Sequence, residues 1–444
     1  MRIVEYDDDF NNFIDEYSKS NVLLIPIYKN ENHVQLRSDL VLLYVYIIDH
    51  DKEYVIPFSH SEAINQSLDR LDKLKTPGEV WCVNKKRFSH IFQEQMNDVD
   101  LMSYMMINRK LDKSDSRTAA HIFFQRGKQV TNIGHIIPIT KHVEYCSNIR
   151  NKFLSFYDVF EIDDAYECYN HILDILGQIE KPGLSVDTES WRRFYRVSPR
   201  DNKVWGEYNL YTQTGRPSNS KDGVNFAGFP KANGSRKCIQ SRHGKDGFLI
   251  QFDYDAYHLR LIGDLIDYKF PDNINVHEYL GKHYFGTETL TPQMYEKSKA
   301  ISFKQMYGRV DHQYKDIPFY SEVTRFIDEL WTRMKKYQYI ETPVYKRKLL
   351  KAFYEDMTRS KLFNYLLQAY ETERNMEVLS RILPLYENIE SKIVLYTYDS
   401  ILIDFNVNDG ADIVHRTKYL LEAGGFPTKV TVGPNYHEMK EKKL

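Results

Sequence analysis

Two aspartates, Asp253 and Asp399, stand at the ends of segments that read as short β-strands. Asp253 ends the apolar run at 248–252, and Asp399 lies between two β runs at 392–405, where we expect a hairpin with Asp399 at its bend. Carboxylates are costly to bury unless a positive partner meets them. Aspartates on adjacent strand ends can share divalent cations, because Mg²⁺ prefers oxygen ligands and binds through carboxylates and substrate phosphates. Two such ions, about 3.5–4 Å apart, would serve phosphoryl transfer; the alternative is two ordinary turn aspartates.

The segment between these aspartates supplies groups that suit a nucleoside triphosphate. YEKSKAISFKQMYGR at 295–309 has helical character, with Lys299, Phe303 and Tyr307 spaced i, i+4, i+8 along one face. The ammonium group would meet phosphates and the two rings would meet sugar and base. The alternative is a basic surface helix that buries two aromatic residues in the core.

The elements that must position these residues fall into two regions of different character. The first 150 residues alternate strands and helices, which indicates an α/β domain. We expect strands at 22–28, 40–48, 53–57 and 80–83, and a capped helix at 61–78. Residues 151–205 are mostly helical, 206–244 form a long loop region rich in turn formers and basic residues, and 321–337 form an amphipathic helix.

The bulk composition bounds the class of protein without naming a partner. The chain has 444 residues, enough for two or three domains, and a net charge of −2. Its four cysteines show no metal-ligand spacing, so we expect a reducing compartment. No run of 18 apolar residues and no apolar leader are found, so we expect neither a membrane span nor secretion.

Three segments in chain order resemble the motifs of family A DNA polymerases, the family of bacterial DNA polymerase I and many bacteriophage replicases. FDYDAYHLR at 252–260 is similar to motif A, KSKAISFKQMYG at 297–308 to motif B, and YTYDSILIDF at 396–405 to motif C. Further segments resemble the family in the same order: QTGRPSNS at 213–220, NVHEYLGKHYFG at 275–286, IETPVYKRK at 340–348 and NYLLQ at 364–368. The resemblance covers about residues 205–444.

The resemblance implies a right-hand polymerase fold with palm, fingers and a short thumb. An N-terminal ribonuclease H-like α/β domain of the 3′–5′ exonuclease type would precede it. The implied division is 1–150 for the exonuclease-like domain, 151–205 for the thumb, 206–271 and 340–444 for the palm, and 272–339 for the fingers. The thumb is about half the usual family length, so we expect low processivity unless a partner protein clamps the DNA.

The same resemblance implies a role for individual residues. Asp253 and Asp399 would hold two Mg²⁺ ions, with Mn²⁺ as an alternative, helped by the backbone carbonyl of Tyr254. Lys299 would contact the triphosphate. The remaining implied contacts are Phe303, Tyr307, His258 and His277 on the nucleotide, and Arg216, Gln368 and Asn364 on the DNA near the primer end. The implied partners are primer-template DNA and deoxynucleoside triphosphates, and the implied activity is primer extension.

Several positions depart from the family pattern. His258 stands where motif A usually carries Glu, the steric gate against ribonucleotides, so we expect a gate of altered stringency. Motif C has Tyr398-Asp399-Ser400 in place of His-Asp-Glu, which leaves Asp253 and Asp399 as metal ligands, with Asp255 as a further helper. Motif B has Tyr295 where an Arg is expected, and Lys297 or Arg309 are candidates to replace its phosphate contact.

The N-terminal domain lacks the carboxylates that hydrolysis of DNA ends would need. Pro26 and Tyr28 stand where the exonuclease pattern has Asp-x-Glu, Phe88 stands at another Asp position, and 143–150 contains no Asp. We therefore expect a degenerate exonuclease and no proofreading. Two alternatives stay open for the whole chain. One is an enzyme with relaxed sugar selectivity or RNA polymerase activity, favoured by His258 and Ser400; the other is a non-catalytic nucleic-acid-binding protein. The resemblance also implies the cytoplasm of a bacterial or phage-infected cell.

Overall fold

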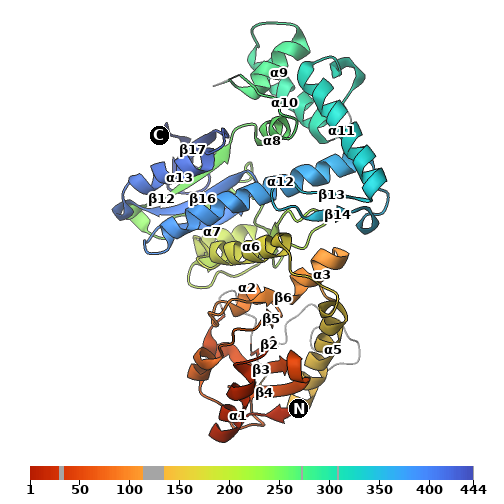
Figure 1. The fold of residues 1–444 in the computed structure, drawn as a ribbon. Helices are drawn as coiled ribbons and strands as arrows, with labels where there is room; N and C mark the ends of the chain where they lie inside the picture. Colours follow the sequence, from red (N-terminus) through yellow and green to blue (C-terminus); the bar gives the residue numbers. More distant parts are fainter. Residues whose placement is uncertain (30–34, 114–134, 272–273, 308–309, 444) are drawn as a thin grey trace. The chain divides into compact units, whose positions relative to one another are not determined.

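The computed structural model describes residues 1–29, 35–113, 135–271, 274–307 and 310–443. The chain forms two compact units, Met1–Gly177 and Gln178–Leu444, and each is described by itself (Figure 1). The division falls within α6 (Asp164–Glu180). The assignment of 151–205 to a thumb stays a prediction, as do the finer palm and fingers boundaries. Within the described ranges, every helix is too short or too polar to cross a membrane.

The N-terminal unit is built on a six-stranded mixed sheet with strand order β1-β4-β3-β2-β5-β6. The strands are β1 (Arg2–Ile3), β2 (Val22–Tyr28), β3 (Leu40–Ile47), β4 (Lys52–Pro57), β5 (Val80–Cys82) and β6 (Asn97–Asp98). Helix α1 (Asp7–Tyr17) covers one face, where the rings of Phe13 and Tyr54 lie 5.0 Å apart. Helix α5 (Ile139–Tyr157) covers the other, with Phe153 5.6 Å from Trp81. The predicted strands of this region are therefore present.

The predicted helix at 61–78 is wrong, because only a 3₁₀ segment at Leu68–Lys73 forms there. The residues before it give their backbone hydrogen bonds to partners outside the segment. The amide of Ser61 donates to the carbonyl of His135 at 3.0 Å, and that of Gln66 to Pro57 at 2.7 Å. The side chain of Asn65 bonds both backbone groups of His60, at 2.7 and 3.0 Å. These tertiary partners outweigh a helical periodicity that is only a weak prior.

The second unit is organised around a five-stranded antiparallel sheet with strand order β15-β16-β12-β17-β18. The strands are β12 (Gly247–Tyr254), β15 (Lys392–Thr397), β16 (Ser400–Asn406), β17 (Thr428–Gly433) and β18 (Lys440–Glu441). Strand β12 lies at the centre, and the predicted hairpin at 392–405 is present as β15 and β16. Alternate residues of β12 point to opposite faces. Phe252 and Tyr254 face helices α12 (Arg359–Ile382) and α13 (Asp412–Glu422), whereas Leu249 joins a cluster with Trp191 and Phe226.

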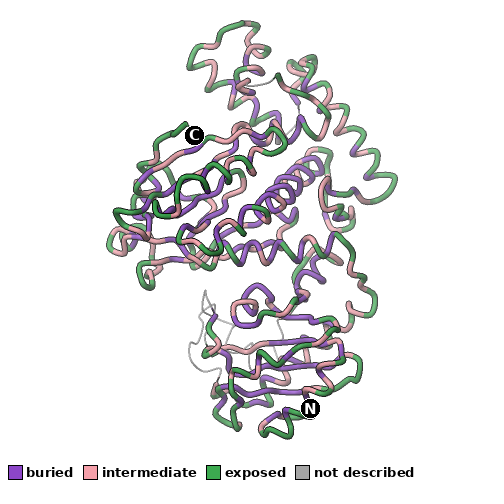
Figure 2. Tube along the Cα trace, turned by 60° about the vertical axis from the view of Figure 1, so that its left-hand side comes forward, coloured by how far each residue is buried: buried purple, intermediate pink, exposed green. Residues whose placement is uncertain are grey.

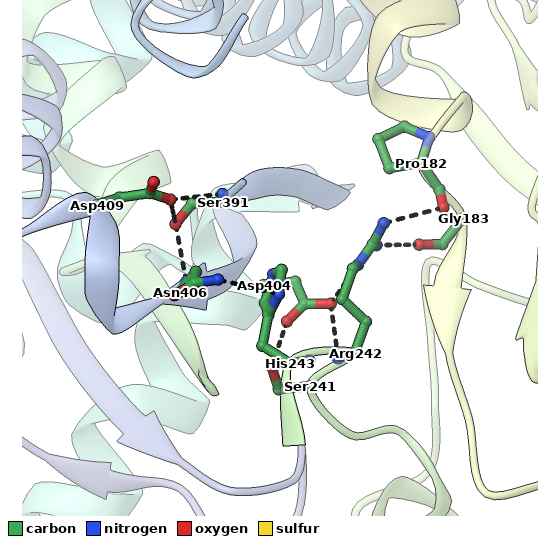
Figure 3. Close-up of polar contacts among 9 residues, drawn as sticks. All are labelled: Pro182, Gly183, Ser241, Arg242, His243, Ser391, Asp404, Asn406 and Asp409. Carbon is green, nitrogen blue, oxygen red and sulfur yellow. Dashed lines mark hydrogen bonds and ion pairs between the residues drawn. The ribbon is translucent and has the colours of Figure 1, made fainter. Parts of the chain in front are cut away.

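The face of β12 that carries Leu249 is covered by the segment that precedes the strand. This segment contains α7 (Thr188–Phe194) and short strands β7 (Leu184–Ser185), β8 (Lys203–Val204), β9 (Tyr208–Asn209), β10 (Ser218–Lys221) and β11 (Val224–Asn225). A buried ion pair fastens it to β16, because Arg242 Nε lies 2.7 Å from Asp404 Oδ2 while Ser241 Oγ donates to Asp404 Oδ1 at 2.6 Å (Figure 3). The predicted loop region at 206–244 is thus partly a small sheet.

Helices supply the rest of the second unit. They are α8 (Tyr257–Leu265), α9 (Val276–Phe285), α10 (Pro292–Tyr307) and α11 (Pro318–Tyr337), with the hairpin β13 (Tyr339–Glu341) and β14 (Lys348–Leu350) after α11. Helices α9 and α10 pack closely, since a Cβ on Gly281 would lie 2.9 Å from Ser298 Oγ. Helix α12 is buried over most of its length (Figure 2) and packs against α8, α11 and α13.

Candidate active site at the end of the central strand

Asp253 and Asp399 lie next to each other at one end of the central sheet. Asp253 on β12 pairs with Ser400, the first residue of β16, and Asp399 immediately precedes Ser400 in the turn. The amide of Tyr254 donates to the carbonyl of Asp399 at 2.9 Å, which fixes the turn against the strand end. Tyr398, the other turn residue, has a left-handed φ of 59°. The sequence prediction of two carboxylates at neighbouring strand ends therefore describes the geometry, while their role as metal ligands stays a prediction.

The electrostatics of the pair favour a bound cation. Burial, and then the neighbouring Asp399, raise the pKa of Asp253 from 3.8 to about 6. Asp399 exposes surface at the turn, yet protein around its carboxyl group removes water and raises its pKa, with Glu371 as the next cause. Two close carboxylates in a partly desolvated site repel each other, and a divalent cation would relieve that repulsion. Oxygen donors of this kind fit Mg²⁺ or Mn²⁺.

Asp255 has other partners. Its Oδ1 lies 2.6 Å from Lys429 Nζ, and its Oδ2 lies 3.7 Å from Arg260 Nη2. Its carboxylate is thus compensated by two cations from the protein, which argues against the predicted help at a metal site. In the described part of the chain, no three or more His, Cys, Asp or Glu side chains gather as a metal-binding group. Any ion here would rest on Asp253, Asp399, backbone oxygen and oxygens from a ligand.

One face of α12 organises the residues around this pair. Gln368, Glu371 and Asn375 follow one another at helical spacing, so they share that face. Gln368 Oε1 accepts from Thr214 Oγ1 at 3.1 Å, and Asn375 Nδ2 donates to the carbonyl of Tyr398 at 2.6 Å. Helix α12 therefore contacts both the segment before the sheet and the turn that carries Asp399.

Glu371 lies at the centre of this face. Its Oε1 lies 2.8 Å from His258 Nε2, and its Oε2 lies 2.7 Å from Arg216 Nε. The second contact is an ion pair without hydrogen-bond alignment, since the N–H of Arg216 is not directed at the oxygen. The guanidinium of Arg216 also lies over the ring of Tyr398, with its carbon 3.6 Å from the ring centroid. The structure thus brings Arg216, His258, Gln368 and the Asp399 turn together.

Three predicted nucleotide-binding residues lie on the packed helices α9 and α10: His277 on α9, and Lys299 and Phe303 on α10. Lys299 Nζ lies 2.9 Å from Glu296 Oε1 and 4.4 Å from the ring centroid of Tyr295. The rings of His277 and Phe303 lie 6.2 Å apart, and Phe303 is half exposed. Burial lowers the pKa of His277, so this ring is neutral at pH 7. Within the described residues, no hydrogen bond or ion pair joins Lys299 to the two aspartates. The side chain of Tyr307 and all of Arg309 lie outside the described residues.

Asn364 is half-buried on α12, and its Oδ1 has no hydrogen-bond partner among the described residues. The side chain of Tyr254 turns away from the strand end, because its hydroxyl donates to the carbonyl of Leu421 at 3.1 Å. The Tyr254 hydroxyl is therefore directed away from the site, and the role of the Tyr254 carbonyl as a metal ligand stays a prediction. DNA contact by Asn364 stays a prediction.

The N-terminal unit has a cluster of its own, in which a lysine pairs with a carboxylate. Lys85 Nζ lies 2.8 Å from Asp174 Oδ2, and the amide of Lys85 donates to Asp98 Oδ2 at 2.9 Å. Asp98 Oδ1 accepts from the amide of Leu101 at 2.9 Å and so caps α3 (Val99–Ile107). Asp100 pairs with Lys113. Asp174 and Asp100 are thus each paired with a lysine, whereas Asp98 accepts from backbone amides.

Comparison with known proteins adds a likeness in structure but none in sequence. No protein-family model matches the chain. No curated protein matches it either. Among solved structures, the POL domain of Pol1 from M. smegmatis, in complex with DNA primer-template and dNTP, is similar with a TM-score of 0.70 and 12% sequence identity. The match covers 98% of this chain and 99% of that chain. The chain has the fold of a DNA polymerase domain.

In this polymerase fold, three residues near the predicted site escaped the sequence argument. Glu371 and Asn375 lie three and seven residues after Gln368, and Lys429 on β17 is paired across the strands with Asp253 on β12. The helical spacing of 364, 368, 371 and 375 was a usable signal for the first two. Lys429 carried no signal, because its neighbour in space is set by strand pairing between distant segments.

Proposed function

We propose that this protein is a template-directed DNA polymerase that extends a primer 3′-hydroxyl with deoxynucleoside triphosphates. The observation that carries the proposal is the position of Asp253 beside Asp399 at the end of the central strand, in a fold similar to a polymerase domain solved with primer-template and dNTP. In the reaction, the primer 3′-oxygen bonds to the α-phosphorus, the bond to the pyrophosphate oxygen breaks, and the hydroxyl proton passes to solvent.

Asp253 and Asp399 would hold the divalent cations, with the Tyr254 carbonyl as a further donor. Bound there, the ions would neutralise charge on the attacking and leaving oxygens. Burial, and then the neighbouring Asp399, raise the pKa of Asp253, and a bound cation would offset both effects. The chain's own contribution is to hold the Asp253 and Asp399 residues in fixed positions. It does so through the β12–β16 register and the hydrogen bond from the Tyr254 amide to the Asp399 carbonyl.

Other residues bind and align the substrates. Lys299 would exchange its exposed partner Glu296 for the triphosphate, a small loss because exposed pairs contribute at most about 1 kcal/mol. Gln368 uses its oxygen on Thr214, which leaves its amide N–H groups to donate. Every Watson–Crick pair presents acceptors in the minor groove, so Gln368 and Arg216 can check pair shape without reading sequence.

We further propose that the protein does not proofread. We also propose that it is a phage-type replication enzyme that acts in the bacterial cytoplasm. The Lys85–Asp174 pair and the bonds from backbone amides to Asp98 support the first of these proposals, because metal ions for hydrolysis would have to displace these partners. A processivity protein is a further proposed partner.

Primer extension on a defined template tests the proposed activity. The wild-type protein is expected to extend the primer with Mg²⁺ and deoxynucleotides, and Asp399→Asn is expected to reduce the rate by about 10³-fold or more while primer-template affinity changes little. Asp246→Asn, at an exposed aspartate in the 3₁₀ turn before β12, is the matched control. Extension only with ribonucleotides would favour an RNA polymerase, and binding without extension would favour a non-catalytic protein.

A further inference from the structure

Glu371 is a buried carboxylate shared by two residues of the site. Its side chain is 1% exposed, and its two oxygens lie 2.8 Å from His258 Nε2 and 2.7 Å from Arg216 Nε. These residues come from distant segments, since His258 lies on α8 and Arg216 precedes the sheet. Glu371 itself lies on α12, so one side chain links three parts of the chain.

A buried charge of this kind strongly constrains the groups around it. An uncompensated carboxylate in the interior is costly, and removing one partner of a buried pair is strongly destabilising because it leaves a buried charge without a partner. The contacts of Arg216 and His258 with Glu371 are therefore strongly favoured over arrangements that leave the carboxylate without partners. The guanidinium of Arg216 has a second constraint, because it lies 3.6 Å from the ring centroid of Tyr398.

Glu371 lies near the proposed reacting centre, so the constraints on His258 and Arg216 can affect which substrates are accepted there. The Glu371 carboxylate is close enough to Asp399 to raise its pKa, after burial. His258 is the second residue of α8, five residues after Asp253, and it stands where the sequence predicts a sugar gate. Arg216 lies beside the turn that carries Asp399. A carboxylate that holds both can set where the sugar ring and the primer-end pair are allowed to sit.

We propose that Glu371 is a positioning residue that sets two selections at once: sugar selection through His258 and base-pair selection at the primer end through Arg216. The inference rests on the proposed polymerase function and goes beyond it. Motif A has His258 in place of the usual Glu, and α12 supplies a carboxylate, Glu371, that contacts the His258 side chain. His258 then presents a fixed ring to the sugar, and Arg216 presents a fixed guanidinium to the pair.

Two ratios measured on the same enzyme test this coupling. The first is kcat/KM for a matched deoxynucleotide over the same ribonucleotide, and the second is extension from a matched over a mismatched primer end. His258→Ala is expected to lower only the first ratio, and Arg216→Ala only the second, each by about tenfold or more. Glu371→Ala is expected to lower both by a similar factor, and Glu371→Ala combined with His258→Ala is expected to lower the sugar ratio no further than His258→Ala alone. Because these are ratios, a reduced folded fraction cancels.

Glu373→Gln is the matched control, because Glu373 is an equally buried carboxylate two residues along α12. It accepts from the amides of Val344 and Tyr345, at 3.2 and 3.0 Å, and so holds the β13–β14 hairpin instead. This variant is expected to leave both ratios unchanged. Glu371→Gln keeps the shape of the side chain and removes its charge, so it is expected to lower both ratios by an intermediate factor. It replaces the alanine variant if that variant does not fold.

The outcomes separate this inference from the proposed function. A wild-type protein that does not extend primers overturns the function itself. If the wild type extends primers but Glu371→Ala and Glu371→Gln slow it with both ratios unchanged, Glu371 is only structural and the inference is wrong. Additive losses of sugar selection in the double variant would equally rule out action through His258.

Discussion

Lys429 is the cross-strand partner of Asp253, on the side of β12 opposite the hairpin that carries Asp399. Side chains paired in this way share a face of the sheet and lie close together. Lys429 therefore opposes the rise in the pKa of Asp253, together with Lys231, while its own ammonium lies 2.6 Å from Asp255. Even with both cations present, burial and Asp399 raise the pKa of Asp253 to about 6.

This balance predicts how the stability of the metal-free protein depends on pH. A carboxyl group whose folded pKa is raised binds more protons in the folded state, so stability falls as pH rises from 3.8 to about 6. Asp253→Asn removes the charge, and it is expected to stabilise the protein by up to about 3 kcal/mol above that window. The difference should shrink towards pH 4 and vanish only well below 3.8, where Asp253 is protonated in the unfolded state as well as in the folded state.

Urea unfolding with a chelator, at pH 4 and pH 7, measures this difference. Asp246→Asn serves as the exposed control and should change stability by less than about 0.5 kcal/mol at both values. An Asp253→Asn protein less stable than wild type at pH 7 would show that the carboxylate has a compensating partner.

Lys299 and Glu296 allow a second prediction, on the proposed triphosphate contact. Lys299→Ala is expected to lower kcat/KM for deoxynucleotides about 10²-fold, because the ammonium would stabilise charge on the departing phosphates. Glu296→Gln removes only an exposed pair at 2.9 Å and should change kcat/KM less than about threefold. Steady-state incorporation of a single nucleotide, with primer-template affinity measured separately by anisotropy, distinguishes the two. Equal losses in both variants would instead indicate that the pair stabilises α10.

The sequence predicted the parts of the fold that depend on local pattern. Continuous apolar runs gave β2, β3 and β12, and the turn at Asp399 follows from two β runs that meet at polar residues. Asp253 and Asp399 were found because a carboxylate at the end of an apolar strand is unusual. The helix predicted at 61–78 failed because its backbone partners come from other segments, such as His135.

The pairings that shape the site could not be predicted in the same way. Asp255 was expected to help bind metal, yet Lys429 and Arg260 compensate it. Glu371 reads as one polar residue among several in the run ETERN, and burial of that whole run is a tertiary outcome. Periodicity identifies a face of α12, but it does not say that His258 and Arg216 meet there.

Asp404 allows a prediction about the scaffold. Its side chain is 1% exposed and pairs with Arg242, while Arg242 Nη2 donates to the carbonyl of Gly183 at 2.8 Å (Figure 3). Asp404→Ala leaves Arg242 without its carboxylate, and it is expected to destabilise the protein by about 3–5 kcal/mol. Urea unfolding checks the size of the effect. The ratio of deoxynucleotide to ribonucleotide incorporation should be unchanged, because Asp404 does not contact the site; a changed ratio would contradict this separation.

The N-terminal unit leads to a prediction about 3′ ends. Lys85 compensates Asp174 at 2.8 Å, and Asp98 is committed to backbone amides of Lys85 and Leu101. Two-metal hydrolysis needs carboxylates free to bind cations, so the protein is expected not to shorten a single-stranded 3′ end with Mg²⁺. The assay should include Asp399→Asn and added pyrophosphatase, because reversal of polymerisation also shortens primers. Shortening that persists in Asp399→Asn and disappears with a chelator would show a working exonuclease in this unit. Shortening lost in that variant would belong to the polymerase site instead.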